Sequence, residues 1–294
     1  MERKKTIQEL TIADEFMFGA VMEKPENCKG LLELILGIEI EHIEVSKEKT
    51  MIYNPKYKGI RLDIYANDEQ NSRYNVEMQA VRKPALLKRS RYYLSEIDME
   101  LLLAGEPYAM LPNTYVIFIC DFDPYGQKKY CYTREQICKE VPGLSMEDGT
   151  HVIFLSTEGE NVEEVPEQLV KFLKYVKSPL EESEQFFDDT YVLQLQNTIR
   201  QIKDSREMGA RYMTFEQLLR EEREESREEG REEGITIGIP MGKGQVIVDF
   251  LREKGNITEE LKNRIMKETD SEVLKKWIKL ALTTDSIQQF ENNM

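Results

Sequence analysis

The sequence predicts an α/β protein, in which a mixed central sheet is flanked by helices and followed by a charged helical C-terminal extension. Three observations support this class. Segments with helical spacing and segments with strand-like alternation follow one another in the order helix, strand, hairpin, helix and buried strand. The run TYVIFICDF at residues 114–122 is almost continuously apolar, as expected of a strand covered on both faces. Beyond residue 178 the pattern becomes helical and strongly charged.

The N-terminal part predicts two helices and a first strand. Residues 11–22 place apolar side chains at helical spacing, with Thr11 or Asp14 available as the cap. Residues 27–36 do the same, and Gly37 supplies a stop. Residues 42–53 alternate weakly between apolar and polar side chains, which favours a strand.

The stretch RLDIYANDEQNSRYNVEMQ, residues 61–79, predicts a hairpin of two strands at 60–66 and 74–81. A helix is expected from Pro84 to about Ala104, because proline suits a first helical turn and leucines recur at helical spacing. The segment HVIFLS, residues 151–156, predicts another buried strand.

The composition restricts the class of protein. Hydrophobic residues make up 40% of the 294 residues, which supports a real core and excludes general disorder. The start, MERKKTIQEL, has no apolar run, and no segment reaches the roughly 18 to 20 apolar residues of a membrane span. A cytoplasmic protein without a membrane partner is therefore expected. The four cysteines show no CxxC spacing, which favours reduced, packed thiols over a zinc site.

Negative charge is concentrated in the second half of the chain. Of the formal net charge of −15, about −3 falls on residues 1–140 and about −12 on residues 141–233. Phosphate contacts require Lys and Arg, so the total charge argues against a general nucleic-acid binder. The first half nevertheless contains a basic run with no acid inside it, formed by Arg82, Lys83, Lys88, Arg89 and Arg91. A local basic face is predicted there.

The extension contains an acid-rich run and a small-residue repeat. Residues 220–233, REEREESREEGREE, can form i,i+4 ion pairs on a helix. Glycines then continue a four-residue step begun at Ser226: Gly230, Gly234, Gly238 and Gly242. One interpretation is a stripe that lets two helices approach closely, giving a homo-oligomer through the C-terminal helix. The other is a solvated linker in which Pro240 breaks the helix. A compact helical tail from residue 246 to about residue 282 follows.

The predicted hairpin raises a specific chemical question. Side chains alternate across a strand, so Asp63 shares one face of the first strand with Arg61, and Glu77 shares one face of the second with Gln79. If the hairpin folds symmetrically about Gln70, Asp63 lies opposite Glu77. Opposed like charges destabilise a strand pair, whereas a divalent cation such as Mg²⁺ binds carboxylates. The alternative is an ordinary amphipathic hairpin with a solvated polar face, on which Arg61 neutralises the nearest acid.

Asp63, followed after thirteen residues by Glu77-Met78-Gln79, resembles the D…ExK core of the PD-(D/E)XK nuclease superfamily, with glutamine in place of lysine. Four further segments, DEFMFGAVM, LLELILGI, KRSRYYLSEI and YVIFICDFD, are similar in order to the recombination-promoting nuclease and transposase branch of that superfamily. The resemblance covers about residues 10–180. It implies a restriction-endonuclease-like core, a nuclease-like domain at residues 1–178, a charged extension at 179–245 and a small helical tail at 246–294.

The resemblance implies metal-dependent phosphodiester hydrolysis with Mg²⁺ or Mn²⁺ as cofactor and double-stranded DNA as partner. Asp63, Glu77 and Gln79 would be catalytic, and Asp63, Glu77 and Glu15 would bind the metal. Gln79 can orient a water molecule by hydrogen bonding but carries no charge. Glu15 has a simpler interpretation as an acid at a helix N-terminus, where the helix dipole favours it.

The helix after the hairpin offers candidates for DNA contact: Lys88, Arg89, Arg91 and Tyr93. Arg89 and Tyr93 are i,i+4 neighbours and share one helix face. Alternatively, the tyrosines pack on the sheet and Arg89 pairs with Glu96. The leading hypothesis is an endonuclease of low sequence specificity. The alternative is a catalytically inactive scaffold of the same fold that binds nucleic acid or a protein through its helical tail.

Overall fold

The computed structural model describes residues 5–51 and 60–294. The chain divides into two compact units, residues 1–213 and 214–294. The centre of the first unit is a mixed sheet with the strand order β1-β2-β3-β4-β6-β5. Its strands are β1 (Ile43–Met51), β2 (Ile60–Asp68), β3 (Arg73–Gln79), β4 (Thr114–Cys120), β5 (Cys131–Arg134) and β6 (Thr150–Ser156). The predicted α/β class is confirmed.

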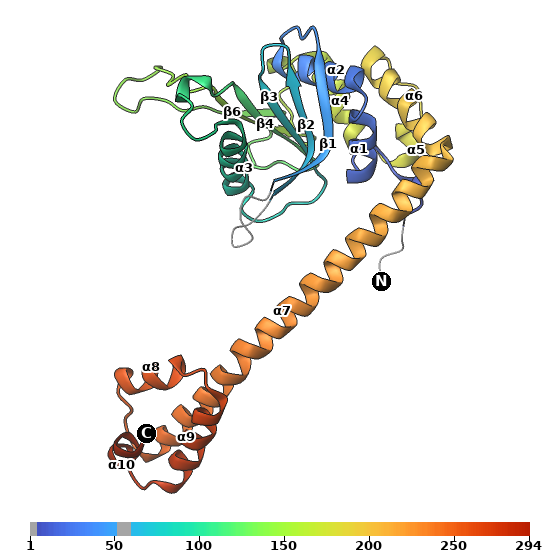
Figure 1. Ribbon diagram of the computed structural model, residues 1–294. Helices are drawn as coiled ribbons and strands as arrows, with labels where there is room; N and C mark the ends of the chain where they lie inside the picture. The colour runs from blue at the N-terminus through green and yellow to red at the C-terminus, as the bar shows by residue number, and fades with distance from the viewer. Residues whose placement is uncertain (1–4, 52–59) are drawn as a thin grey trace. The chain divides into compact units, whose positions relative to one another are not determined.

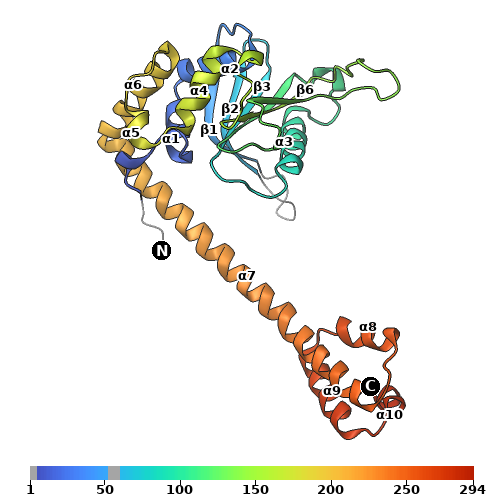
Figure 2. The same ribbon diagram turned by 180° about the vertical axis from the view of Figure 1, so that it is seen from behind.

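Helices cover both faces of this sheet. The helix α3 (Leu86–Leu101) lies on one face, and α1, α2, α4 and α6 lie on the other (Figures 1 and 2). In addition to α3, the first unit contains the helices α1 (Glu15–Met22), α2 (Pro25–Leu36), α4 (Glu167–Lys177), α5 (Leu180–Ser183) and α6 (Thr190–Asp204). Under α3, a buried core includes Leu94, Ile97, Phe118 and Phe154. Within residues 5–51 and 60–294, none of the helices has the length and apolar character needed to span a bilayer.

Of the two caps that the sequence offers for the first helix, Asp14 is the one that forms: the helix begins at Glu15, and the Asp14 carboxylate accepts the backbone N–H of Thr11 at 2.8 Å and closes a turn there. One predicted helix start is wrong for a local reason. The helix predicted from Pro84 begins at Leu86, because Ala85 adopts a left-handed conformation with φ 59°.

The other predicted elements of the first unit are confirmed within a few residues. The second helix runs from Pro25 to Leu36 and is capped by Gly37, whose φ of 65° suits glycine. The strand predicted at 42–53 corresponds to β1, and its last two positions lie outside the described residues. The short edge strand β5 has no clear sequence signal and was not predicted.

The turn of the β2–β3 hairpin is fixed by one buried acid. The Asp68 Oδ1 atom accepts the backbone N–H groups of Gln70 at 3.0 Å and Ser72 at 2.8 Å. Its Oδ2 atom accepts the Tyr74 hydroxyl at 2.6 Å. Asn71 takes the left-handed conformation with φ 66°, which asparagine tolerates. These bonds hold the turn in one conformation, and that conformation determines which residues of the two strands face each other.

The first unit continues past the change in sequence character at residue 178. The buried Asn27 of α2 donates its amide to the Thr198 hydroxyl of α6 at 3.2 Å. Its backbone carbonyl accepts the Tyr191 hydroxyl at 2.7 Å, and its side-chain oxygen accepts the Gln194 amide at 2.8 Å. These bonds hold α6 against α2, so the charged region beyond residue 178 begins inside the first unit.

The second unit is helical. It contains most of α7 (Arg206–Lys254), then α8 (Glu259–Lys267), α9 (Ser271–Thr283) and α10 (Ile287–Asn293). Its core includes Ile247, Leu251, Leu274, Trp277 and Phe290. The predicted tail is confirmed as helical, and it reaches Asn293.

The helix break expected at Pro240 is wrong, because α7 continues through it. A proline removes one hydrogen bond of the helix, but the packing of Ile247 and Leu251 into the core holds the helix beyond it. A Cβ atom added at Gly230, Gly234, Gly238 or Gly242 would meet nothing within 4 Å in the described part of the chain. The close approach of a second helix along these glycines stays a prediction.

Candidate active site

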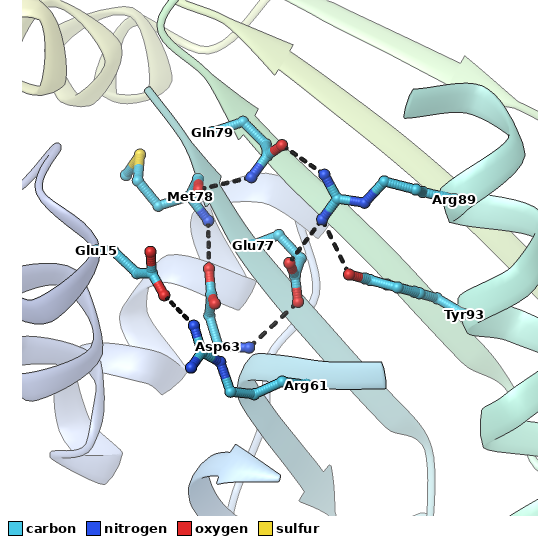
Figure 3. A network of polar contacts seen from close by, with 8 residues as sticks. All are labelled: Glu15, Arg61, Asp63, Glu77, Met78, Gln79, Arg89 and Tyr93. Carbon is cyan, nitrogen blue, oxygen red and sulfur yellow. Dashed lines mark hydrogen bonds and ion pairs between the residues drawn. The ribbon is translucent and has the colours of Figure 1, made fainter. Parts of the chain in front are cut away.

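The hairpin brings Asp63 and Glu77 to facing positions. Ile64 pairs with Val76, so the next residues outward, Asp63 and Glu77, face each other, as a symmetrical hairpin predicts. The backbone N–H of Asp63 donates to Glu77 Oε1 at 3.2 Å, and the backbone N–H of Met78 donates to Asp63 Oδ2 at 3.1 Å (Figure 3). The two carboxylates therefore take over hydrogen bonds at the point where the regular strand pairing ends.

The polar face of β3 is buried, so the interpretation of a solvated amphipathic hairpin is wrong. Asn75, Glu77 and Gln79 are 0%, 2% and 5% exposed, and Asp63 is half-buried. The reason lies in the partner elements. The β3 strand is central and parallel to β4, where Glu77 pairs with Phe118, and α3 packs over this side of the sheet.

Burial gives both acids an unusual electrostatic state. Burial, together with the neighbouring carboxylates of Glu77 and Glu15, raises the pKa of Asp63 well above its ordinary range. Burial raises the pKa of Glu77 to about 7, although the N–H of Asp63 and the guanidinium of Arg89 act in the opposite direction. Burial therefore disfavours the ionised form of both acids, and their hydrogen bonds and neighbouring cations do not fully offset that cost.

Glu15 lies at the start of α1 and faces this site from the other side of the hairpin. Its Oε1 atom is 2.8 Å from Nη2 of Arg61, and both side chains are about two-fifths exposed. Arg61 thus forms its ion pair with Glu15, and its charge also acts to lower the pKa of Asp63. No cluster of three or more Asp, Glu, His or Cys residues that could hold a metal occurs in the described residues. Glu15, the predicted third metal ligand, therefore lies near Asp63 but is ion-paired with Arg61.

Arg89 of α3 reaches into the site. Its Nη1 atom donates to Gln79 Oε1 at 2.8 Å, and its Nη2 atom donates to the Tyr93 hydroxyl at 2.9 Å (Figure 3). The same Nη2 atom lies 3.6 Å from Glu77 Oε2. The pairing of Arg89 with Glu96 that the sequence left open is therefore not the one formed. Tyr93 is buried and stacks on Phe118, as the alternative interpretation of the tyrosines expected.

The other two residues predicted to bind DNA stand apart from this network. Lys88 and Arg91 are exposed on α3. They present positive charge to solvent on the helix that carries Arg89, while Arg89 and Tyr93 point inward. The structure thus separates the four predicted DNA-binding residues into an exposed pair, Lys88 and Arg91, and a pair that contacts the site, the partly buried Arg89 and the buried Tyr93.

Asp63 and Glu77 fit a divalent cation. Their carboxylates lie at adjoining positions, and both pKa values are raised, first by burial and then by neighbouring carboxylates. Mg²⁺ is commonly held by one or two carboxylates, with waters and substrate phosphate completing its coordination. Two carboxylates are therefore enough protein ligands for a divalent cation, and Glu15 is not required as a third.

A mixed sheet in which a hairpin places an acid opposite the acid of an ExQ segment defines a restriction-endonuclease-like α/β core. A family model described as PD-(D/E)XK nuclease family transposase matches residues 13–229. The chain belongs to this family, and its membership supports a nuclease-like or transposase-like function. Nucleases of the PD-(D/E)XK type generally depend on a divalent metal, and the family indicates DNA as substrate. No curated protein and no solved structure matches the chain.

Sequence reasoning missed two contributions to the site. Asp68 fixes the register of the hairpin, and its signal was an Asp four residues before Ser72 in a turn. The sequence predicts Arg89 as a DNA-binding residue, but its contacts with Gln79 and Glu77 have no local sequence signal. They join residues on different elements through the packing of α3.

Proposed function

We propose that this chain is a metal-dependent endonuclease that hydrolyses phosphodiester bonds in double-stranded DNA with little sequence specificity. The observation that carries the proposal is the facing pair of the half-buried Asp63 and the buried Glu77, whose pKa values are both raised. An isolated pair of buried acids is unfavourable, and a bound divalent cation removes that cost. Mg²⁺ or Mn²⁺ is the proposed cofactor.

When bound, the cation polarises the scissile phosphate and lowers the pKa of the attacking water. The water oxygen forms a new bond to phosphorus and gives up a proton, while one P–O ester bond breaks and its oxygen takes up a proton. Asp63 and Glu77 hold the cation in their ionised forms. The N–H groups of Asp63 and Met78 orient the two carboxylates for this task. Glu15 becomes a further ligand if Arg61 releases it.

Lys88 and Arg91 suit phosphate contacts along the DNA, because both are exposed cations on the helix beside the site. Such contacts would position the duplex without reading its sequence, in agreement with low specificity. We also propose a cytoplasmic location and a homo-oligomer formed through the glycine stripe of α7.

The test is plasmid nicking with Mg²⁺ or Mn²⁺ by the wild-type chain and by Asp63→Asn. Asparagine keeps an oxygen that can accept the Met78 N–H but removes the charge, so the fold is retained and the metal is lost. We expect the rate to fall by about 10²-fold or more. Activity that survives the substitution would reject the site.

Calorimetric titration with Mn²⁺ separates this proposal from an inactive scaffold of the same fold. The endonuclease binds Mn²⁺ in the wild-type chain and not in Glu77→Gln. A scaffold would show no binding that depends on Glu77, and its affinity for DNA would not depend on the metal.

A further inference from the structure

The residue that stands at the usual lysine position, Gln79, has both ends of its amide engaged. Its Nε2 atom donates to the backbone carbonyl of Met78 at 3.0 Å. Its Oε1 atom accepts the guanidinium of Arg89 at 2.8 Å. The side chain is 5% exposed. An amide held in this way faces Arg89 and carries no charge of its own, so it is poorly placed to do the work of a lysine.

The guanidinium of Arg89 is held from several sides. Besides Gln79, it contacts the Tyr93 hydroxyl at 2.9 Å and lies 3.6 Å from the Glu77 carboxylate. Its carbon Cζ stands 5.4 Å from the centre of the Tyr93 ring and 5.7 Å from that of Phe118. The side chain is 26% exposed, so part of it remains accessible. An arginine does not lose its proton in proteins, so this position carries a permanent, oriented positive charge.

We propose that Arg89, from α3, supplies the positive charge that a lysine on the strand would otherwise bring to this site, and that Gln79 is the positioning residue that holds it there. The inference rests on the proposed nuclease function. Charge at this place stabilises the negative charge that develops on the phosphate oxygens as the P–O bond to water forms. Tyr93 holds the second nitrogen, so the guanidinium keeps one orientation.

A purely structural role is the competing explanation. In that case Arg89 only neutralises Glu77 in the metal-free protein, and its loss would weaken folding while the folded, Mn²⁺-loaded chain keeps its kcat. The proposal predicts a lower kcat with the metal site intact. Removing a cation 3.6 Å from the Glu77 carboxylate removes repulsion toward a divalent ion, so affinity for Mn²⁺ should stay the same or rise while turnover falls.

The experiment compares the full chain with Arg89→Met, with the double variant Gln79→Lys/Arg89→Met and with a charge control, Arg220→Gln, on the exposed part of α7. Methionine keeps an apolar stem against the rings of Tyr93 and Phe118. Nicking kinetics give kcat and KM, calorimetry gives the Mn²⁺ affinity without DNA, and thermal melting reports folding.

We expect Arg89→Met to lower kcat about 10²-fold with little change in KM and with Mn²⁺ binding retained. The double variant places a positive charge on the strand again, and its kcat should be at least about tenfold higher than that of Arg89→Met. Arg220→Gln should behave as wild type. If Arg89→Met does not fold, Arg89→Lys replaces it, and its kcat should remain within about tenfold of wild type because the charge is kept.

Wild-type kcat in Arg89→Met overturns the inference. So does a folded, Mn²⁺-binding double variant that is as slow as Arg89→Met, or a folded Arg89→Lys that is as slow as Asp63→Asn. These outcomes leave the proposed function intact, since the wild-type chain still cleaves. A wild-type chain that neither nicks DNA nor binds Mn²⁺ overturns the proposed function, and the inference falls with it.

Discussion

Replacing Glu77 by glutamine should stabilise the metal-free first unit, and the gain should grow with pH. In the fold the pKa of Glu77 is about 7, against an ordinary value of 4.5. Between these values the unfolded chain has lost the proton that the folded chain keeps. As pH rises through this window, ionisation lowers the free energy of the unfolded state more than that of the folded state. The free energy of unfolding therefore falls, and the fall levels off above pH 7. Glutamine has no proton to lose, so the variant escapes this loss.

The size of the effect follows from the same pKa values. The difference between the folded and ordinary pKa corresponds to about 3 kcal/mol at full ionisation. The value of about 7 already includes the opposing attraction of Arg89, so nothing further is subtracted for this ion pair. We therefore expect Glu77→Gln to be near neutral at about pH 4.5 and to be stabilised by about 3 kcal/mol above pH 7.

The sequence provides separate optical signals for the two units. All 14 tyrosines lie within residues 1–213, and the only tryptophan, Trp277, lies in the second unit. Urea unfolding in EDTA, followed by tyrosine absorbance, reports the first unit, while Trp277 fluorescence serves as an internal control that should not change. An equal difference in unfolding free energy at low and high pH would refute the reasoning, as would a loss of stability above pH 7.

Three further predictions concern other contacts. Tyr93→Phe removes the hydroxyl that holds Arg89 but keeps the ring, so kcat for nicking should fall about fivefold, with unchanged melting. Asp123→Ala removes the acceptor of the backbone N–H groups of Tyr125 and Lys128, and should lower the unfolding free energy by about 2 kcal/mol in urea titrations. Gly37→Ala should cost about 1 kcal/mol by the same measurement, because φ is 65° there.

Each of these has a matched comparison. Tyr92→Phe, on the neighbouring position of α3, controls for the loss of a hydroxyl, and an equal fall in kcat would remove the case for Tyr93. Asp123→Asn should recover part of the loss seen with alanine, since an amide oxygen still accepts; no recovery would contradict the hydrogen-bond explanation. For Gly37, nothing lies within 4 Å of an added Cβ, so a neutral alanine would show that backbone conformation carries no cost there.

Local patterns in the chain were enough for most elements of the fold. The alternation of apolar and polar residues at 60–66 and 74–81 predicted both strands of the hairpin, and symmetry about Gln70 predicted their register. One helix start differs from the prediction. The left-handed Ala85 moves the start of α3 to Leu86, because a single backbone angle can decide where a helix begins.

The candidate site was predicted in part. The alternation of side chains along each strand predicted that Asp63 and Glu77 share one face of the hairpin. The resemblance to PD-(D/E)XK nucleases implied a function for that face. Neither could show that the face is buried, because burial depends on β4 and α3, which arrive from later in the chain. The partner of Glu15 was likewise undecided until the fold placed Arg61 2.8 Å away.

By itself, the sequence determined the facing acids, since period-2 alternation and a short turn are properties of neighbouring residues. Only the tertiary structure decided what surrounds them. The packing of α3 on the sheet brings Arg89 to Gln79 and Glu77, and no spacing rule connects a helix side chain to a particular strand position. In the sequence, Gln79 marks the position where the site lacks the positive charge of a lysine. In the fold, Gln79 contacts Arg89 of α3, which we propose supplies that charge.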